Sequence, residues 1–591
     1  MYRAIAVAEV SPGVQSLLKR GFPFAVREYQ LKLNQLIPFL PEVRSISGNK
    51  PNIVYNAVTF DSREVRPGAI YVALQGTSVD GHDFIPNAIE NGATAIIGTS
   101  GLARDTFDLP VPYIRVSDSR CAMAWAAAAL YDFPARDLVT IGVTGTDGKT
   151  TTSTILYYIL KEAGFATGMI TTVAAMINGV EIDTGFHVTT PESPDVHRFL
   201  AEMRDSGVTH VVLEVTSHGL AQQRVAAVDF DIAVVTNITH EHLDYHKTRE
   251  DYFAAKAILF EGLGKRTRAI KPLAILNLDD PDSYRFLEPR TAVKKVCYSA
   301  EAKDQEAFAT IGSLKSSPGG LELEARFREM PNSRDNQAIR VHSSLIGKYN
   351  AANILAAMSA AIYGLGVIPE TAAAGVAKCG YISGRMELIS MGQDFFAMVD
   401  FAHTPNALAK ALDSARGLLM DYHPARPDAR IIAIFGSAGL RDREKRRMMP
   451  AVAAKKADIM ILTAEDPRTE SLEEILGQMA EEAEASGGKL NETYYVEPDR
   501  GNAIRLGVRL ARAGDLVVID YPQRVQIPSV VLYRIFCHCS SILRILRIAS
   551  LPKYIPVVVY SGSSSFRITG RIFTSMLSYG LNKNRIKSCS V

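Results

Sequence analysis

The sequence predicts an α/β protein of several domains built around parallel β-sheets. Its 591 residues are too many for one hydrophobic core, because chains longer than roughly 300 residues divide into domains. Short runs of β-branched and aliphatic residues alternate with stretches of helical spacing along most of the chain. This alternation is typical of parallel sheets that helices cover on both faces.

Three groups of elements are expected, in residues 31–135, 136–382 and 383–519. The first holds short β-type runs at 69–74 and 94–97 and predicts a small amino-terminal α/β domain. The strands expected in the other two are 139–144, 210–215, 232–236, 395–399, 431–435, 459–462 and 516–519. A helix is expected from 151 to 163. Residues 1–30 form an amino-terminal extension without a clear pattern.

Composition indicates an ordinary globular protein, with 47% apolar and 22% charged residues. No uninterrupted apolar run reaches the roughly 18 residues of a membrane span, and the amino terminus lacks the features of a signal peptide. Six cysteines do not make a disulfide framework, so a reducing cytoplasm is the expected compartment. We expect a monomer that binds no nucleic acid.

The strongest local signal is the loop Gly145–Thr150, of sequence GTDGKT, between a predicted strand and a predicted helix. Glycines let the backbone wrap around phosphates, and the helix start adds partial positive charge. Lys149 would neutralise the β- and γ-phosphates and Thr150 would ligate Mg²⁺. The spacing departs from the common G-x4-G-K-[ST] form because position 143 is valine. A glycine-rich turn with an unrelated lysine is the alternative, which the flanking strand and helix disfavour.

Polar side chains follow other predicted strands, where ligands bind in open α/β sheets. Glu214 and His242 could hold Mg²⁺ and orient the γ-phosphate, or could only make local hydrogen bonds. In the third domain, charged clusters follow three strands and would line one face suited to ATP and an amino acid. These clusters contain Asp400 with His403, Arg441 with Asp442, Arg443 and Lys445, and Asp466 with Arg468. Lys256 lies in a helical, mostly apolar segment, where a lysine is usually solvated.

Taken together, these stretches resemble the Mur ligase family over residues 31–519. The motifs that carry the resemblance are Asp61–Arg63, Asp80–Phe84, Gly145–Thr152, Thr189–Glu192, Glu214–His218 with Gln222 and Arg224, Asn237–Asp244, Tyr252–Phe260, Gly347–Asn350 with Asn353, Gly384–Glu387, Asp400–Pro405, Gly436–Arg447 and Glu465–Arg468. The resemblance implies a central P-loop ATPase-like parallel sheet, flanked by a small amino-terminal α/β domain and a carboxyl-terminal Rossmann-like domain.

The resemblance also implies a role for each matching position. ATP would be bound by Gly145, Thr146, Asp147, Gly148, Lys149, Thr150, Thr151, Asn353, Asp400 and His403. The UDP-linked substrate would be bound by Ser62, Thr189, Thr190, Thr216, Gln222 and Arg224. The amino acid would be bound by Arg441, Asp466 and Arg468. Thr150, Glu214 and His242 would bind Mg²⁺, and Lys149, Lys256 and His242 would be catalytic. Lys256 matches a lysine that is carbamylated in the family, which changes its interpretation.

The implied activity is an ATP-dependent ligase of peptidoglycan precursor synthesis, and hence of cell wall, cell shape and cell division. It would add a diamino acid to UDP-MurNAc-L-Ala-D-Glu through an acyl phosphate. Glu241 stands where the family usually has Asp. Asp466 stands where diaminopimelate-adding members usually have Asn, while Arg468 and Arg441 suit a distal carboxylate. We therefore predict meso-diaminopimelate, with L-lysine as the alternative. A more distant alternative, folylpolyglutamate or cyanophycin synthesis, fits the Asp61–Phe84 stretch less well.

The carboxyl-terminal segment departs from the family. After Ile519 the family continues with a Gly-Lys-Gly-His-Glu motif, which is absent here, and residues 521–591 hold ten Lys/Arg and no Asp or Glu. Our hypothesis is that residues 520–591 are an out-of-frame translation. The alternative is a basic tail that binds an anionic surface. Without the motif, a remnant that binds UDP-precursor and ATP without turnover is a further alternative.

Overall fold

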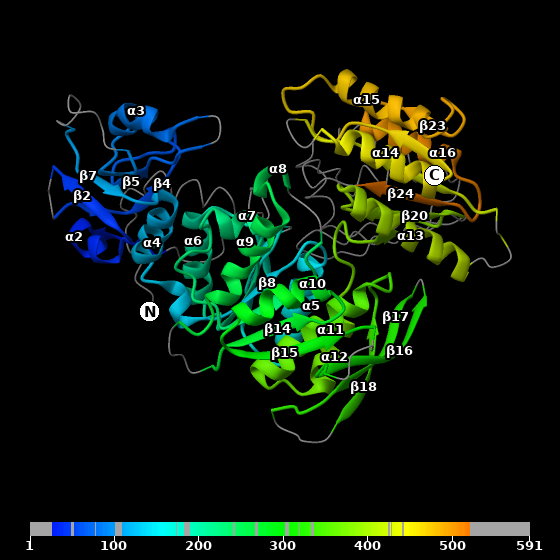
Figure 1. The fold of residues 1–591 in the computed structure, drawn as a ribbon, viewed down its shortest axis with the longest axis horizontal. Coiled ribbons are helices and arrows are strands. Elements are labelled where there is room, and N and C mark those ends of the chain that lie inside the picture. Colours follow the sequence, from blue (N-terminus) through cyan, green and yellow to red (C-terminus); the bar gives the residue numbers. More distant parts are fainter. Residues whose placement is uncertain are drawn as a thin grey trace, which may run out of the picture. The chain divides into compact units, whose positions relative to one another are not determined.

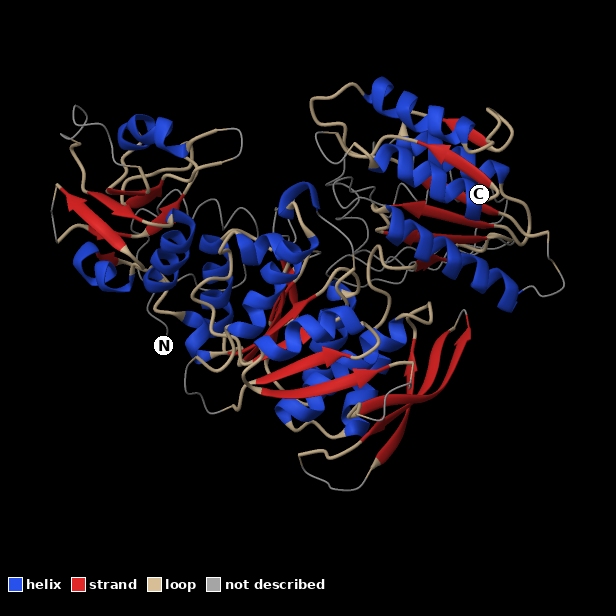
Figure 2. Ribbon diagram, in the orientation of Figure 1, coloured by secondary structure: helices blue, strands red, loops and turns tan. Residues whose placement is uncertain are grey.

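The computed structural model describes residues 27–48, 52–76, 79–100, 109–172, 174–182, 190–239, 243–265, 270–301, 306–317, 319–331, 336–422, 426, 428–439 and 443–520 (Figure 1). The chain divides into two compact units, Met1–Glu387 and Leu388–Val591. Figure 2 distinguishes the strands and helices of each unit, which are taken in turn below. Within the described ranges, no helix is long and apolar enough to cross a membrane.

A five-stranded sheet of order β2-β7-β6-β5-β4 opens the first unit. Its elements are β2 (Val43–Ser47), β4 (Ala57–Thr59), β5 (Ala69–Val72), β6 (Ala95–Gly98), β7 (Tyr113–Val116), α3 (Ile85–Glu90) and α4 (Ser119–Leu130), with α2 (Leu33–Leu36) and the pair β1 (Leu31–Lys32) and β3 (Val54–Tyr55) beside them. Side chains alternate between the two faces of a strand. Ile70 and Val72 accordingly share a core with α4, while Ala69 and Tyr71 share one with α3.

The eleven-stranded sheet of the first unit has the order β11-β10-β9-β12-β8-β13-β14-β15-β16-β17-β18. Its strands are β8 (Val139–Thr144), β9 (Thr167–Ile170), β10 (Ala175–Ile177), β11 (Val180–Ile182), β12 (His210–Glu214), β13 (Ile232–Val235), β14 (Leu273–Asn277), β15 (Lys294–Ser299), β16 (Ala309–Ser317), β17 (Gly320–Phe327) and β18 (Gln337–Ser343). From β9 to β16 neighbouring strands are parallel, and β16, β17 and β18 form an antiparallel meander.

Helices cover both faces of this sheet, as the sequence predicts. They are α5 (Lys149–Glu162), α6 (Ser193–Asp205), α7 (Ser217–Ala221), α8 (Leu243–His246), α9 (Arg249–Glu261), α10 (Pro281–Leu287), α11 (Asn350–Ser359) and α12 (Pro369–Lys378). Val212 of β12 packs with α5 and α11, whereas its neighbours Val211 and Leu213 pack with α6. Strand β8 has the predicted bounds. Helix α5 begins two residues earlier than predicted, at Lys149, because Gly148 is its amino-terminal cap.

The second unit holds a six-stranded sheet of order β19-β20-β24-β21-β22-β23. Its elements are β19 (Glu387–Ile389, which begins at the last residue of the first unit), β20 (Phe396–Asp400), β21 (Ile431–Phe435), β22 (Ile459–Leu462), β23 (Tyr494–Val496), β24 (Leu516–Asp520), α13 (Pro405–Tyr422), α14 (Lys445–Lys456), α15 (Leu472–Ala485) and α16 (Arg500–Leu510). Strands β20 to β23 of this order are parallel. Helix α16 packs on the face that includes Ile432 and Val517. The domain boundaries at 135/136 and 382/383 stay predictions.

Candidate active site

The glycine-rich loop between β8 and α5 lies beside the residues that come directly after β13. Gly145 has φ +153° and Gly148 has φ +82°. A Cβ atom at Gly145 would overlap Thr236 Oγ1, and one at Gly148 would overlap Asn353 Oδ1. The two glycines are therefore required both by backbone conformation and by space.

We expect Gly148→Ala to weaken ATP binding severely and to destabilise the first unit. The left-handed backbone alone costs an alanine about 1–2 kcal/mol, and the overlap with Asn353 adds to this cost. Gly164→Ala is the matched control, because Gly164 has φ +84° with nothing within 4 Å of an added Cβ. Thermal unfolding and nucleotide titration of both variants separate the two causes. Equal effects of the two substitutions would show that the contact with Asn353 is unimportant.

Side chains after β13 hold the loop in place. Asp147 N donates to Asn237 Oδ1 at 3.0 Å, and Asp147 O accepts from Thr236 Oγ1 at 2.6 Å and from Asn237 Nδ2 at 3.1 Å. Thr146 Oγ1 lies 2.9 Å from the hydroxyl of Tyr252 in α9. Lys149 Nζ donates to Thr146 O at 2.7 Å, so the lysine folds back over the loop. A phosphate chain would therefore meet a rigid backbone and a cation.

Thr150 and Glu214 form the candidate metal site. The buried Thr150 hydroxyl donates to Glu214 Oε2 at 2.9 Å, and Thr172 N donates to the same oxygen at 3.1 Å. A hydroxyl and a carboxylate are oxygen donors of the kind that Mg²⁺ binds together with substrate phosphates. The third predicted ligand, His242, lies outside the described residues. Within the described residues no group of three or more His, Cys, Asp or Glu is placed to hold a metal.

The burial of Lys256 differs from the expectation drawn from helical spacing. Its side chain in α9 is only 1% exposed, whereas a solvated lysine was expected. The Nζ atom donates to Gly145 O at 2.7 Å and lies 4.6 Å from the centroid of the Tyr252 ring. The lysine amine is therefore buried against the first residue of the phosphate loop.

The structure brings together four of the predicted substrate residues at the carboxyl end of β12. Thr190 Oγ1 lies 3.0 Å from Thr216 Oγ1, and Arg224 donates to Thr190 O at 2.7 Å and to Gln222 Oε1 at 2.7 Å. Burial lowers the pKa of the Arg224 guanidinium, which nonetheless stays charged. Ser62 is buried in the five-stranded sheet region, where its carbonyl accepts from Asn91 Nδ2 at 2.8 Å. Thr189 lies outside the described residues.

Glu192 is a functional candidate to which the sequence analysis gave no role. Its carboxylate pairs with Arg224 at 2.9 Å and, more loosely, with Arg120 of α4 at 3.9 Å. It thus connects the predicted substrate residues with the helix that packs on the five-stranded sheet. The Thr-Thr-Pro-Glu motif was the signal that contained it.

The remaining predicted binding residues are Asn353 in the first unit and several residues of the second unit. In the first unit, Asn353 Oδ1 accepts from Thr152 Oγ1 at 3.4 Å, directly beside Gly148. In the second unit, Asp400 ends β20, and His403 Nδ1 lies 3.3 Å from Phe401 O. Arg468, with φ +53°, forms an ion pair with Asp466 at 3.7 Å. Arg441 lies outside the described residues.

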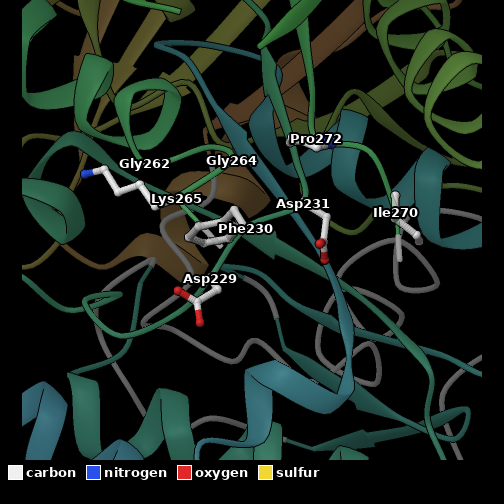
Figure 3. A pocket seen from close by; sticks show the side chains of 8 residues that line it. All are labelled: Asp229, Phe230, Asp231, Gly262, Gly264, Lys265, Ile270 and Pro272. Carbon is white, nitrogen blue, oxygen red and sulfur yellow. The ribbon is translucent and has the colours of Figure 1, made fainter. Parts of the chain in front are cut away.

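A small pocket lies apart from these residues, at the amino ends of β13 and β14 (Figure 3). Asp229, Asp231, Lys265 and Pro272 are among the residues that line it. The Asp231 carboxylate accepts from Thr140 N at 2.9 Å, so it fixes the start of β8. Since ligands of open α/β sheets bind at the opposite, carboxyl ends, we interpret the pocket as structural.

A parallel sheet, a phosphate-binding loop at its carboxyl edge and a hydroxyl–carboxylate pair beside that loop define an enzyme that uses a nucleoside triphosphate. Three models of one family match the chain: "Mur ligase family, catalytic domain" at residues 54–131, "Mur ligase middle domain" at 143–361 and "Mur ligase, glutamate ligase domain" at 384–520. The chain belongs to the Mur ligase family. The three-domain α/β fold and the class of ATP-dependent ligase are thereby confirmed.

Individual relatives show which members of the family this chain is similar to. UDP-N-acetylmuramyl-tripeptide synthetase of Roseiflexus sp. is 37% identical over 500 residues, which cover 83% of this chain and 93% of the relative. UDP-N-acetylmuramoyl-L-alanyl-D-glutamate–2,6-diaminopimelate ligase of Geobacillus kaustophilus is 38% identical over 490 residues, covering 83% and 94%. A solved structure of a ligase of that second name has 28% identity and a TM-score of 0.55, covering 83% of this chain and 93% of its own. MurF of Thermotoga maritima in complex with ADP, at 20% identity and a TM-score of 0.54, covers 81% and 96% and shares the fold.

Proposed function

We propose that the chain joins meso-diaminopimelate to the D-glutamate of UDP-MurNAc-L-Ala-D-Glu, with hydrolysis of ATP to ADP and phosphate. The observation that carries this proposal is the double contact of Glu214. Its carboxylate accepts from Thr150 of the phosphate loop, and its backbone carbonyl accepts from Thr190 Oγ1 at 3.3 Å. One residue therefore joins the phosphate site to the substrate site, which suits a reaction between a phosphate and a substrate carboxylate.

The proposed reaction has two steps. The D-glutamate carboxylate attacks the γ-phosphorus, its new P–O bond replaces the bond to ADP, and an acyl phosphate results. The amine of diaminopimelate then attacks the acyl carbon, phosphate leaves, and the amine loses a proton as the amide forms. Positioning carries much of both steps. Lys149 and the loop amides hold the phosphates, and Thr190, Thr216 and Arg224 hold the UDP-linked substrate.

Two further features of the site belong to this proposal. Mg²⁺, held by Thr150, Glu214 and His242, would neutralise charge that develops on the phosphates. Lys256 is carbamylated in the working enzyme: its neutral amine adds to CO2 and releases a proton, and the carboxylate-like group that results could bind a second Mg²⁺. We further propose a cytoplasmic location, which cysteine usage and nucleotide-linked substrates favour, and a monomeric enzyme.

The test is phosphate release that depends on UDP-MurNAc-L-Ala-D-Glu, with meso-diaminopimelate and L-lysine compared as acceptors. Tripeptide formation with diaminopimelate, at a kcat/KM at least about 100-fold above that for lysine, is expected from the charged contact of Arg468 to the distal carboxylate. Arg468→Ala is expected to remove most of this preference. Phosphate release without tripeptide from either acceptor would instead support the remnant that binds without turnover.

We expect Glu192→Gln to raise the KM for the UDP-linked substrate about tenfold, corresponding to ~1.4 kcal/mol, through loss of the charge that orients Arg224. The KM for ATP is expected to stay the same, because the ion-pair partners of Glu192, Arg224 and Arg120, lie outside the phosphate loop. Asp282→Gln is the control, since Asp282 forms an exposed pair with Arg249. Equal increases of the KM for the UDP-linked substrate and the KM for ATP would contradict a role of Glu192 that is limited to the UDP-linked substrate.

A further inference from the structure

A carboxylate in the second unit is held by two arginines close to the predicted amino-acid residues. Glu470 lies between β22 and α15, and Arg443 Nη2 donates to its Oε1 atom at 2.8 Å. Arg446 Nη2 donates to its Oε2 atom, and Arg446 Nη1 donates to Gln478 of α15 at 3.1 Å. The side chains of Arg446 and Glu470 are 2% and 14% exposed. Each oxygen of Glu470 therefore has its own guanidinium partner, which fixes the position and the orientation of the carboxylate.

The same loop holds Arg468 in a backbone conformation that needs support. Its φ is +53°, in the left-handed region that residues other than glycine seldom adopt. Glu470 N donates to Pro467 O at 3.0 Å and closes a turn around Arg468. Inside this turn, Arg468 N donates to Asp466 Oδ1 at 3.3 Å. An unusual backbone conformation persists only where the surrounding contacts determine it. The ion pairs of Glu470 supply such contacts at the end of the turn.

The start of the loop is fixed by separate contacts. Arg500 of α16 donates to Ala464 O at 2.7 Å, and Gly439 N donates to Asp466 O at 2.8 Å. A Cβ atom at Gly439 would lie 2.0 Å from Pro467 O, so the loop packs directly on the backbone after β21. Residues 464–467 are therefore held from outside the turn. The direction in which the Arg468 side chain leaves the loop then depends on how the turn is closed, which is where Glu470 acts.

We propose that Glu470, clamped by Arg443 and Arg446, is a positioning residue that sets the affinity for an amino acid with a distal carboxylate. It acts through Arg468 rather than on the amino acid itself. A guanidinium that binds a carboxylate through two hydrogen bonds tolerates only small displacements, so the turn must be fixed before the amino acid arrives. The inference rests on the proposed role of Arg468 and deepens it, because it names the residues that make this arginine selective.

The first test is a calorimetric titration of meso-diaminopimelate into the full chain, with UDP-MurNAc-L-Ala-D-Glu and ADP present so that no reaction occurs. Glu470→Ala is expected to bind diaminopimelate at least about tenfold more weakly, because Arg468 is no longer fixed. Its affinity for UDP-MurNAc-L-Ala-D-Glu is expected to stay the same. Equal diaminopimelate affinities of Glu470→Ala and the unchanged chain, or binding that is detectable in neither, overturn the proposal.

The matched control is Asp515→Ala, which also breaks a shielded ion pair of the second unit. Asp515 is 4% exposed, pairs with Arg430 at 2.6 Å and directly precedes β24, so it lies at the amino ends of the strands. The loop that holds Arg468 follows the carboxyl end of β22. Asp515→Ala is expected to lower the thermal midpoint of unfolding without weakening diaminopimelate binding. A loss of affinity equal to that of Glu470→Ala would show that any destabilisation of this unit is sufficient, and would overturn the proposal.

A second variant separates positioning from stability. Arg446→Met combined with Glu470→Leu removes both buried charges, and apolar replacement of a buried ion pair is often neutral for stability. We expect a thermal midpoint close to that of the unchanged chain, with diaminopimelate affinity as weak as in Glu470→Ala. Recovery of the affinity together with the stability would show that the pair only supports the fold, which overturns the positioning role.

The third test asks whether Glu470 acts through Arg468. In a chain that already carries Arg468→Ala, Glu470→Ala is expected to weaken diaminopimelate binding by less than about twofold, because the guanidinium that it positions is gone. Losses that multiply in full overturn the proposal. These titrations do not depend on turnover. If the affinities change as expected but the unchanged chain forms no tripeptide, only the proposed reaction is contradicted.

Discussion

Lys256→Met is expected to lower the rate of ligation by at least about 1,000-fold, or roughly 4 kcal/mol of transition-state stabilisation. The Lys256 amine is buried and touches Gly145 O, so its carbamate would lie directly beside the phosphate loop. Methionine fills similar space without a charge, and burial of a charge is itself costly. We therefore expect the thermal midpoint of unfolding to stay close to that of the unchanged chain. Ligation rate and unfolding, measured together, distinguish a lost reaction from a lost fold.

The control for this substitution is Lys265→Met, at an exposed lysine just beyond α9, which is expected to retain full activity. Carbamylation is measured separately, by ¹³C NMR of the chain in ¹³C-labelled bicarbonate. One carbamate signal is expected, which disappears in Lys256→Met. A fully active Lys256→Met variant, or a signal that persists in it, contradicts the assignment.

Features determined by neighbouring residues were predictable from the sequence. The bounds of β8, β21 and β22 follow from aliphatic runs, and the phosphate loop follows from glycine and lysine at a strand end. The glycines show the physical reason, because the left-handed conformation of Gly148 ends the loop locally, although the start of α5 was predicted two residues too late. The central parallel sheet likewise follows from alternating strands and helices.

Features that depend on contacts distant in sequence were not predictable from spacing. Lys256 is buried because its amine meets Gly145 O, 111 residues away, and no local pattern shows this. Glu192 gains importance only when α4 brings Arg120 near Arg224. Arg385 reaches Thr150 across 235 residues. The meander β16–β18 was missed because its strands extend a sheet whose order is set by non-local pairing.

The second large effect is expected at the carboxyl end of the chain. A chain whose gene is corrected to continue after Ile519 in the family frame, with its Gly-Lys-Gly-His-Glu motif, is expected to form tripeptide at least about 100-fold faster, or roughly 3 kcal/mol. The reason is that the motif helps to form the amino-acid pocket in the family that this sequence resembles, and the family match ends at residue 520. Sequencing of the DNA through codon 520 comes first. An uninterrupted frame there contradicts the hypothesis of an out-of-frame segment, of which residues 521–591 lie outside the described residues.

Asp520, the last residue of β24, is a buried carboxylate with acidic neighbours. It is 1% exposed at the end of β24, paired in register with Asp400, and burial together with the charge of Glu465 raises its pKa well above the usual range. A raised carboxyl pKa means that stability falls as pH rises through the folded-state pKa, because ionisation is then penalised. Asp520→Ala is therefore expected to stabilise the second unit by about 1–3 kcal/mol at pH 8, and less at pH 5. Asp520→Ala is not expected to restore ligation. Removal of residues 521–591 would restore ligation only if a basic tail, rather than the missing motif, were the cause of low activity. Unfolding of these variants at both pH values measures the contribution of this buried carboxylate independently of activity.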